Sequence, residues 1–229
     1  MIQTPAALVL LPQFPVATVI ASLKIPAFTG TTIAVRQYVR RVSVDLSMAV
    51  LICCTAFVAA LTGSQVLLLV SNRFMKPVIF IVLILVAVYT YSKKNFGEQV
   101  RKTQSPKRQL LYAFLISLVI GFYDGFIGPG AGSFLVLAFI AILGFDFLRA
   151  SAHAKLVNMC TNLGSIVLFL VKGTILWRIA LPMALFNGIG SLLGARLAVS
   201  KGNRFIRVFF LFIVMVTLLR FGYDVFVRK

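Results

Sequence analysis

Acidic residues are scarce in this chain, and so are other side chains on which enzymes usually rely. The 229 residues include five Asp and Glu, one His, three Cys and one Trp, and 12% of them are charged. With His153 as the single histidine and no Cys-x-x-Cys pair, a zinc cluster of the usual type lacks ligands. An enzyme is a poor alternative, because it needs a nucleophile with a base, or a metal set. We therefore expect no catalytic residue, metal or cofactor.

Hydrophobic residues dominate the composition instead. They make up 60% of the chain, and the mean hydropathy is +1.01. Soluble domains are about 45–50% apolar with about a quarter of their residues charged, so the composition predicts an all-α, polytopic membrane protein. Spanning helices need about 20 apolar residues. Clear candidates are Val44–Val70, Pro77–Tyr91, Leu148–Val171, Ile175–Val199 and Phe205–Phe226, and less regular ones are Ala6–Leu11, Val16–Val35, Leu110–Phe122 and Phe134–Leu143.

The net charge of +18 comes from 23 Lys and Arg, which lie in short clusters between the apolar segments. Such clusters are typical of helix ends that meet lipid headgroups, so the partner they indicate is the bilayer and not a nucleic acid. The one clearly polar linker, Ser92–Gln109, carries six Lys and Arg and one Glu. That charge favours a cytoplasmic position, although basic loops elsewhere leave the full topology open.

The chain resembles itself at an offset of 131 residues. This offset places Phe14–Lys24 over Phe145–Lys155 and "NRFMK" of Asn72–Lys76 over "NRFIR" of Asn203–Arg207, without gaps. We therefore predict two tandem repeats. Residues 1–92 would form the first transmembrane repeat, residues 93–109 a basic linker and residues 110–229 the second repeat.

The same alignment puts Met1 over Gly132, so partners for the preceding helix and glycine-rich turn would come before Met1. We expect the chain to begin inside its first repeat, roughly 30 residues short of a full one. Whether the two repeats are parallel or inverted is left open, because half-helices make the crossings ambiguous to count.

Lys24 and Lys155 occupy equivalent places in the two repeats, each within an apolar segment. A charged residue in a spanning segment usually faces a cavity and serves a function, and pseudo-symmetric transporters bind substrate at the repeat interface. Two ammonium groups at that interface would attract an anion. The alternative is that both lysines lie near helix ends and extend to the headgroups.

Polar side chains accompany both lysines. Lys155, Asn158 and Asn162 follow helical spacing on one face, with Thr161 beside them, and Ser22 precedes Lys24. These groups could bind anion oxygens or hold helices together. Pro26 is expected to kink or interrupt the first of the two helices. His153 aligns with Ser22 and is either a proton carrier or a contact to a neighbouring helix.

The stretch "GFYDGFIGPGAGSF" contains five glycines between Gly121 and Gly132. Glycines permit non-helical backbone whose amides bind anions, and the half-helix that follows would direct its positive N-terminus at the same place. Asp124 could pair with a lysine, carry a coupling proton or cap the turn. The residues expected to line the anion site here are Gly128, Gly130, Gly132 and Ser133.

This stretch, followed by "GFDFLRASAHAKLVNMCTNLGSIVLFLVKG", resembles the second-repeat signature of the sulfite exporter TauE/SafE family, also called the toluenesulfonate uptake permease family. "IQTPAALVLLPQFPVATVIASLKIPAFTG" resembles the first-repeat segment, without the glycine-rich turn that precedes it in the family. The resemblance covers essentially the whole chain. It implies a multi-pass transporter of the bacterial inner membrane that moves sulfite, sulfonates or related anions.

The sequence thus favours a permease in which Lys24, Lys155 and glycine-turn amides hold an anion between two repeats that alternate access. A homo-oligomer is compatible with this interpretation. A channel or a non-transporting subunit of a membrane complex is the alternative. Single-channel currents would identify the former and obligatory co-purification the latter.

Overall fold

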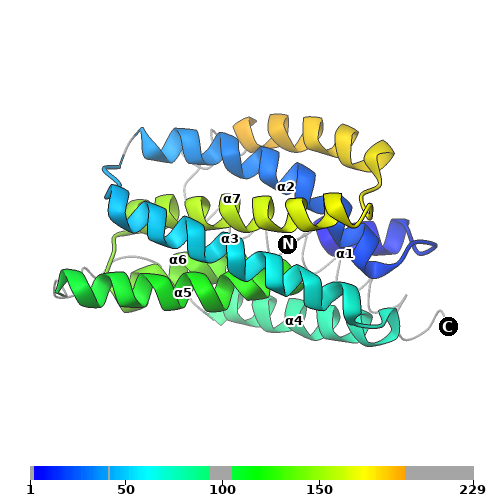
Figure 1. The fold of residues 1–229 in the computed structure, drawn as a ribbon, viewed down its shortest axis with the longest axis horizontal. Helices are drawn as coiled ribbons and strands as arrows, with labels where there is room; N and C mark the ends of the chain where they lie inside the picture. Colours follow the sequence, from blue (N-terminus) through cyan, green and yellow to red (C-terminus); the bar gives the residue numbers. More distant parts are fainter. Residues whose placement is uncertain (1–2, 41, 93–104, 194–229) are drawn as a thin grey trace.

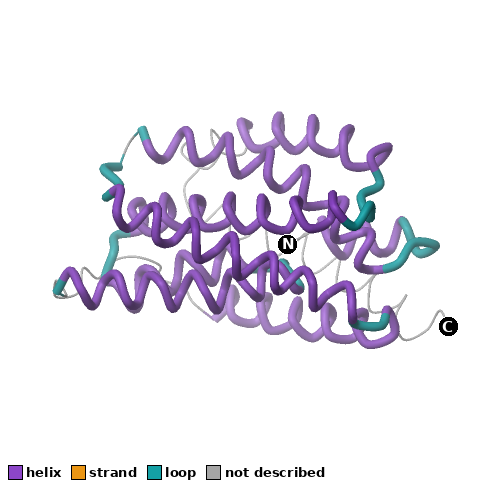
Figure 2. The backbone as a smooth tube through the Cα atoms, viewed as in Figure 1, coloured by secondary structure: helices purple, strands orange, loops and turns teal. Residues whose placement is uncertain are grey.

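The computed structural model describes residues 3–40, 42–92 and 105–193, and this part of the chain is helical with no strand (Figures 1 and 2). The expectation of an all-α protein is confirmed. The helices are α1 (Gln3–Leu10), α2 (Val16–Val39), α3 (Leu46–Leu69), α4 (Asn72–Ser92), α5 (Pro106–Phe126), α6 (Ala131–Leu143) and α7 (Phe147–Val171), followed by a helix over Trp177–Leu193.

Four of these helices, α2, α3, α5 and α7, are long and apolar enough to cross a membrane, with 21 to 25 residues each. At about 1.5 Å per residue they reach roughly 30 Å or more, the thickness of a bilayer core. Helix α6 has 13 residues and is too short to span by itself. The predicted segment Phe205–Phe226 and the end of Ile175–Val199 lie outside the described residues.

Pro26 does not interrupt α2, so of the two outcomes expected from the sequence, a kink or an interruption, the second is wrong. The helix runs from Val16 to Val39 with Pro26 inside it. A proline lacks the amide that would bond to the preceding turn, but α2 is supported at this level by the helix Trp177–Leu193. The Asn187 side-chain amide donates to the Pro26 carbonyl at 2.8 Å, and the Ser191 hydroxyl donates to the Gly30 carbonyl at 3.0 Å.

The glycine-rich stretch is less broken than the sequence indicates. Helix α5 continues to Phe126 and includes Gly121 and Gly125, so the non-helical turn is confined to residues 127–130. The helical glycines allow close packing against α3: a Cβ on Gly125 would lie 2.2 Å from the Ala60 carbonyl oxygen. Gly63 of α3 is equally tight, since its Cβ would lie 2.2 Å from the Phe122 carbonyl oxygen. Small residues let membrane helices approach closely, and here they override the weak helix propensity of glycine.

The helices form one bundle in which the two predicted repeats interleave (Figure 1). Helix α3 of the first repeat packs against α5 and α7 of the second, and α2 packs against α7. Helix α6 packs against α5 and α7, while α1 and α4 contact α2. Helices α2 and α7 therefore meet inside the bundle, with α3 and the helix Trp177–Leu193 on either side.

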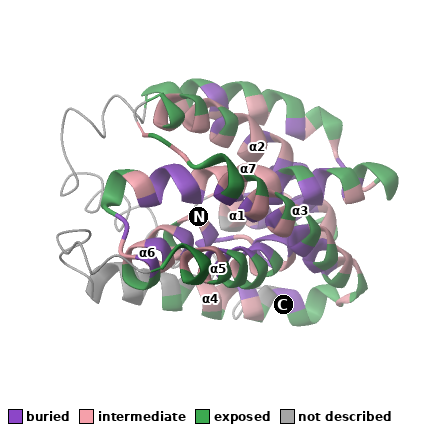
Figure 3. Ribbon diagram, turned by 60° about the vertical axis from the view of Figure 1, so that its left-hand side comes forward, coloured by how far each residue is buried: buried purple, intermediate pink, exposed green. Residues whose placement is uncertain are grey.

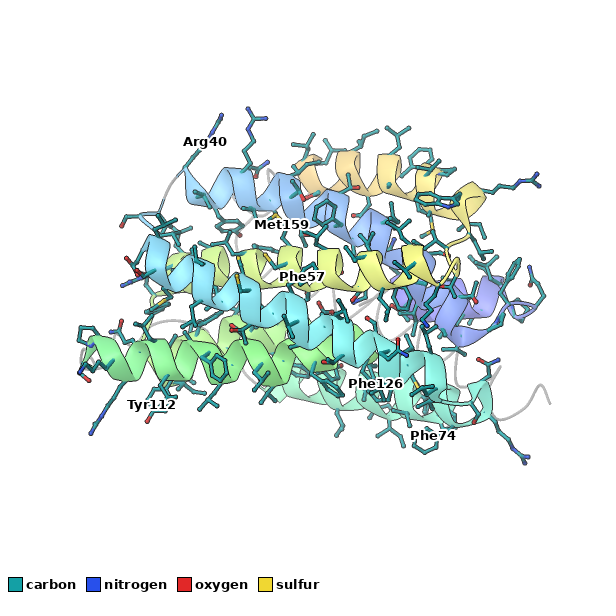
Figure 4. The ribbon with its side chains drawn as sticks, viewed as in Figure 1. Arg40, Phe57, Phe74, Tyr112, Phe126 and Met159 are labelled. Carbon is teal, nitrogen blue, oxygen red and sulfur yellow. The ribbon has the colours of Figure 1, made fainter. Side chains whose placement is uncertain are left out.

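Buried residues face the inside of this bundle and exposed ones the outside (Figure 3). Arg40 and Phe74 project from its surface in Figure 4, and Phe74 is 59% exposed. Large exposed apolar side chains suit a surface in contact with lipid, where the backbone is satisfied within helices. They occur on all sides of the bundle and include Val58, Leu69, Val119, Val171 and Leu185.

Helix boundaries agree with the predicted repeat. Helices α2 and α7 begin at Val16 and Phe147, 131 residues apart. Helix α3 begins at Leu46 and its counterpart at Trp177, again 131 residues apart. The counterpart of α4 lies outside the described residues. This agreement supports the duplication, which stays a prediction.

Candidate functional site

Lys24 and Asp124 form an ion pair inside the bundle. The Lys24 Nζ donates to the Asp124 backbone carbonyl at 2.6 Å and lies 3.3 Å from its Oδ1 atom. Lys24 is 5% exposed and Asp124 4% exposed. Because both groups are removed from water, leaving either of them buried without its partner would be costly. The alternative in which Lys24 extends to the headgroups is therefore not what the structure shows.

Thr161 of α7 completes this group. Its hydroxyl donates to Asp124 Oδ2 in a short hydrogen bond and also contacts the Asn158 carbonyl oxygen at 2.9 Å. Thr161 is fully buried. Lys24, Asp124 and Thr161 thus join α2, α5 and α7 through side chains, and we call this set the ion-pair group.

The glycine turn lies beside the ion pair. Gly128 and Gly130 both have φ of +89°, a conformation that side chains other than glycine rarely adopt. A Cβ on Gly128 would lie 3.7 Å from Lys24 Nζ. Tyr123 fastens the turn, since its hydroxyl donates to the Pro129 carbonyl. Lys24 is eight residues into α2, about 12 Å along the helix axis, so the non-helical backbone lies within the length of the bundle.

A second polar group, which we call the polar row, consists of Lys155, Asn158 and Asn162 on α7. The Asn162 side-chain amide donates to Asn158 Oδ1 at 2.9 Å, which confirms that these two side chains meet on one face. Lys155 is half-buried, and no hydrogen bond or ion pair joins it to any residue that the structure describes. It is therefore a lysine within a spanning helix without a counter-charge in that part of the chain.

The N-terminus of α6 lies against the polar row. A Cβ on Gly132 would lie 3.2 Å from Asn158 Nδ2. The Gly130 carbonyl accepts hydrogen bonds from the Ser133 and Phe134 amides and so begins the helix. The Ser133 side chain is exposed, so the structure does not bring it to the row. The start of a helix carries a partial positive charge, which adds to that of Lys155.

Two other residues expected at the site, Ser22 and His153, make contacts that belong to the packing of the bundle. The Ser22 hydroxyl donates to the Thr18 carbonyl and accepts from the Leu176 amide, both at 2.8 Å. The His153 ring packs against two aromatic rings, with centroid distances of 5.9 Å to Phe139 and 5.0 Å to Phe145. Neither residue contacts the ion-pair group or the polar row, and His153 lies next to neighbouring helices as one interpretation proposed.

Sequence reasoning did not identify Ser64 as part of this region. Its hydroxyl lies 3.1 Å from the Gly125 carbonyl and 2.8 Å from the Ser165 hydroxyl, so it joins α3, α5 and α7 directly behind Asp124. A serine beside Gly63 in an apolar helix is the signal that could have indicated it. Across the described residues no three His, Cys, Asp or Glu side chains are grouped to hold a metal.

A multi-pass helical bundle with buried polar groups beside a glycine-broken helix is the architecture of a membrane transporter. The profile of the sulfite exporter TauE/SafE family matches residues 1–221, and the chain belongs to this family. This confirms the resemblance found in the sequence and the expectation of a multi-pass protein of the bacterial inner membrane.

Curated relatives agree with this assignment. The chain is 33% identical over 208 residues to the probable membrane transporter protein YfcA of Escherichia coli K12, covering 91% of this chain and 77% of that one. It is 32% identical over 198 residues to a probable membrane transporter protein of Haemophilus influenzae, covering 86% and 77%. It is also 32% identical over 209 residues to the probable membrane transporter protein ORF9 of a Sinorhizobium species, covering 90% and 78%. No solved structure matches the chain.

Proposed function

We propose that this membrane transporter carries a small sulfur-containing anion, such as sulfite or a sulfonate, between two repeats that alternate access. The observation that carries the proposal is that Lys155, without a partner among the described residues, lies one helical turn from Asn158, whose side chain lies against the start of α6. In a spanning helix such a cation calls for a counter-ion. Asn158 and Asn162 supply amide donors, and the α6 N-terminus supplies backbone donors of the kind that bind oxyanions.

The charges of the buried groups support a single anion. Lys24 and Asp124 neutralise one another, which leaves Lys155 as the net positive charge of the two groups. An anion beside Lys155 would restore neutrality. Lys24 would then serve as a second contact when Asp124 releases it. The name of the family, which refers to sulfite export, agrees with a substrate of this size and charge.

Uptake into vesicles tests the proposal. Purified protein is reconstituted, and entry of labelled sulfite or toluenesulfonate is measured for the natural chain, Lys155→Met and Lys172→Met. Lys172 is an exposed residue at the end of the same helix, so its variant is a matched control for the loss of one positive charge. We expect Lys155→Met to lose at least tenfold in uptake and Lys172→Met to keep it. Equal uptake by all three proteins would refute the Lys155 site, and saturation with counterflow would separate a carrier from a channel.

A further inference from the structure

We propose that Asp124 competes with the transported anion for Lys24, so that the anion binds together with one proton taken up by Asp124. The inference rests on the proposed function and adds its coupling ion. The transported anion would occupy the place of the Asp124 carboxylate beside the Lys24 ammonium. The proton comes from solution and is held on an oxygen of Asp124.

The geometry of the ion pair allows this exchange. The Lys24 ammonium has three donors, and its short contact, at 2.6 Å, is with the Asp124 backbone carbonyl. The carboxylate oxygen is 3.3 Å away, longer than the roughly 2.7–2.9 Å typical of a charge-assisted bond. The carboxylate is therefore the looser of the two contacts. A substrate oxygen can replace it while Lys24 stays bonded to the carbonyl.

Thr161 can satisfy Asp124 in both protonation states. A hydroxyl has one hydrogen to donate, and two acceptors surround it: Asp124 Oδ2 and the Asn158 carbonyl oxygen. When Asp124 is ionised, Thr161 donates to the carboxylate. When Asp124 is protonated, its O–H donates to Thr161, and the Thr161 hydrogen turns to the Asn158 carbonyl. In both states Asp124 Oδ2 and the Thr161 hydroxyl stay hydrogen-bonded to each other, which lowers the penalty for switching.

The protonation switch reaches the polar row through Asn158. This residue supplies the alternative acceptor through its backbone and contacts both Asn162 and the start of α6 through its side chain. A change at Asp124 therefore alters hydrogen bonding next to the place proposed for the anion.

Within the described residues, Asp124 has one charged neighbour. Lys24 faces it from α2, Thr161 from α7, and the turn presents Gly128. On the α3 side Ser64 bonds to the Gly125 carbonyl, and on α5 the Tyr123 hydroxyl is bonded to Pro129. The other carboxylates of the described residues, Asp45 and Asp146, cap helices α3 and α7. Two anionic groups on one buried ammonium would repel each other strongly, and protonation of Asp124 removes that repulsion.

The linkage between proton binding and anion binding determines the result to be expected from a binding measurement. If anion and proton bind together, affinity for the anion falls about tenfold per pH unit wherever Asp124 is ionised in the free protein. Toluenesulfonate is the probe, because a sulfonate keeps its charge from pH 5 to 8, whereas sulfite itself titrates near neutral pH. Calorimetry of the purified full chain in two buffers that differ in ionisation enthalpy gives the number of protons taken up for each anion bound.

We expect one proton per anion for the natural chain and none for Asp124→Asn, whose binding should not change with pH and should be the tighter at alkaline pH. Asp146→Asn is the matched control at a helix end and should keep the proton uptake. If the natural chain binds toluenesulfonate without proton uptake, the coupling is refuted while the proposed function stands, and this holds even if Asp124→Asn does not fold. If it binds neither toluenesulfonate nor sulfite at any pH, the proposed function fails and the coupling with it.

Discussion

Lys24 and Lys155 stand at aligned positions on two packed helices, yet the bundle surrounds them differently. Lys24 is bonded to Asp124, while Lys155 has no partner among the described residues. The predicted repeat therefore has a lysine at each of two aligned positions, and packing gives one of them a carboxylate partner. In the proposed function, the other lysine is the one that binds the substrate.

Other aligned positions of α2 and α7 differ in the same way. Asp146 caps α7, since its side chain accepts from the Arg149 amide at 2.9 Å. The aligned residue before α2 is Pro15, and there Asn72 of α4 accepts from the Val16 amide at 2.9 Å instead. The start of α7 is therefore capped by a residue next to it in the sequence, whereas the start of α2 is bonded by a residue from another helix.

The largest expected effect comes from breaking the ion pair. Lys24→Met leaves the Asp124 carboxylate buried without its cation, which we expect to lower the free energy of unfolding by about 3–5 kcal/mol. Lys155→Met removes a lysine that has no partner to leave behind and should change it by less than about 1 kcal/mol. Unfolding of the two purified variants in detergent measures the difference. The double variant Lys24→Met/Asp124→Asn should recover most of the loss, and equal losses in the two single variants would contradict the comparison.

A smaller effect is expected at the contacts that flank α7 and α2. A Cβ on Gly164 of α7 would lie 2.4 Å from the Phe57 carbonyl oxygen, whereas a Cβ on Gly188 would lie 3.4 Å from the Ile33 Cδ1 atom. Gly164→Ala forces two backbones apart and should destabilise by about 1–3 kcal/mol. Gly188→Ala makes an ordinary contact and should change stability by less than about 0.5 kcal/mol. Thermal unfolding of both variants tests this, and a Gly188→Ala loss as large as that of Gly164→Ala would show that the two contacts are equivalent.

The smallest expected effect concerns the helix starts. Asp146→Ala and Asn72→Ala each remove the acceptor for a helix N-terminus, and each should lower stability by about 1 kcal/mol. The two losses should add, because the caps serve different helices and share no partner. Thermal unfolding of the single and double variants checks this. A double variant no worse than either single one would mean that one cap has no effect.

The sequence predicted closely where helices lie, but it did not predict where a helix continues without a break. Long apolar segments predicted α3 and α7 within about two residues, because a spanning helix must satisfy its backbone internally. Local signals were misleading at Gly125, which like Gly121 lies inside α5, and Pro26 lies inside α2 without interrupting it. At the glycines, contacts with α3 outweighed local propensity, and at Pro26 the neighbouring helix bonds to the backbone of α2.

The sequence predicted which residue types lie at the candidate site, but it did not predict which side chains pair with each other. The lysines, Asn158, Thr161 and the glycine turn were identified because polar and flexible residues are conspicuous in an apolar chain. Three roles for Asp124 were open in the sequence, and the structure shows it paired with Lys24. Ser22 and His153, aligned in the repeat, have contacts only with structural neighbours.

Composition and pattern by themselves determined that this chain enters a membrane and resembles the sulfite exporter family, and they predict a repeat at an offset of 131 residues. These properties depend on residue types and their spacing, which a hydropathy profile and a sequence alignment detect directly. Only the tertiary structure decided which of the two lysines is neutralised. Lys24 and Asp124 are 100 residues apart and lie on α2 and α5, and the packing of the bundle brings them within hydrogen-bonding distance. No local pattern encodes that contact, because it depends on how three helices pack.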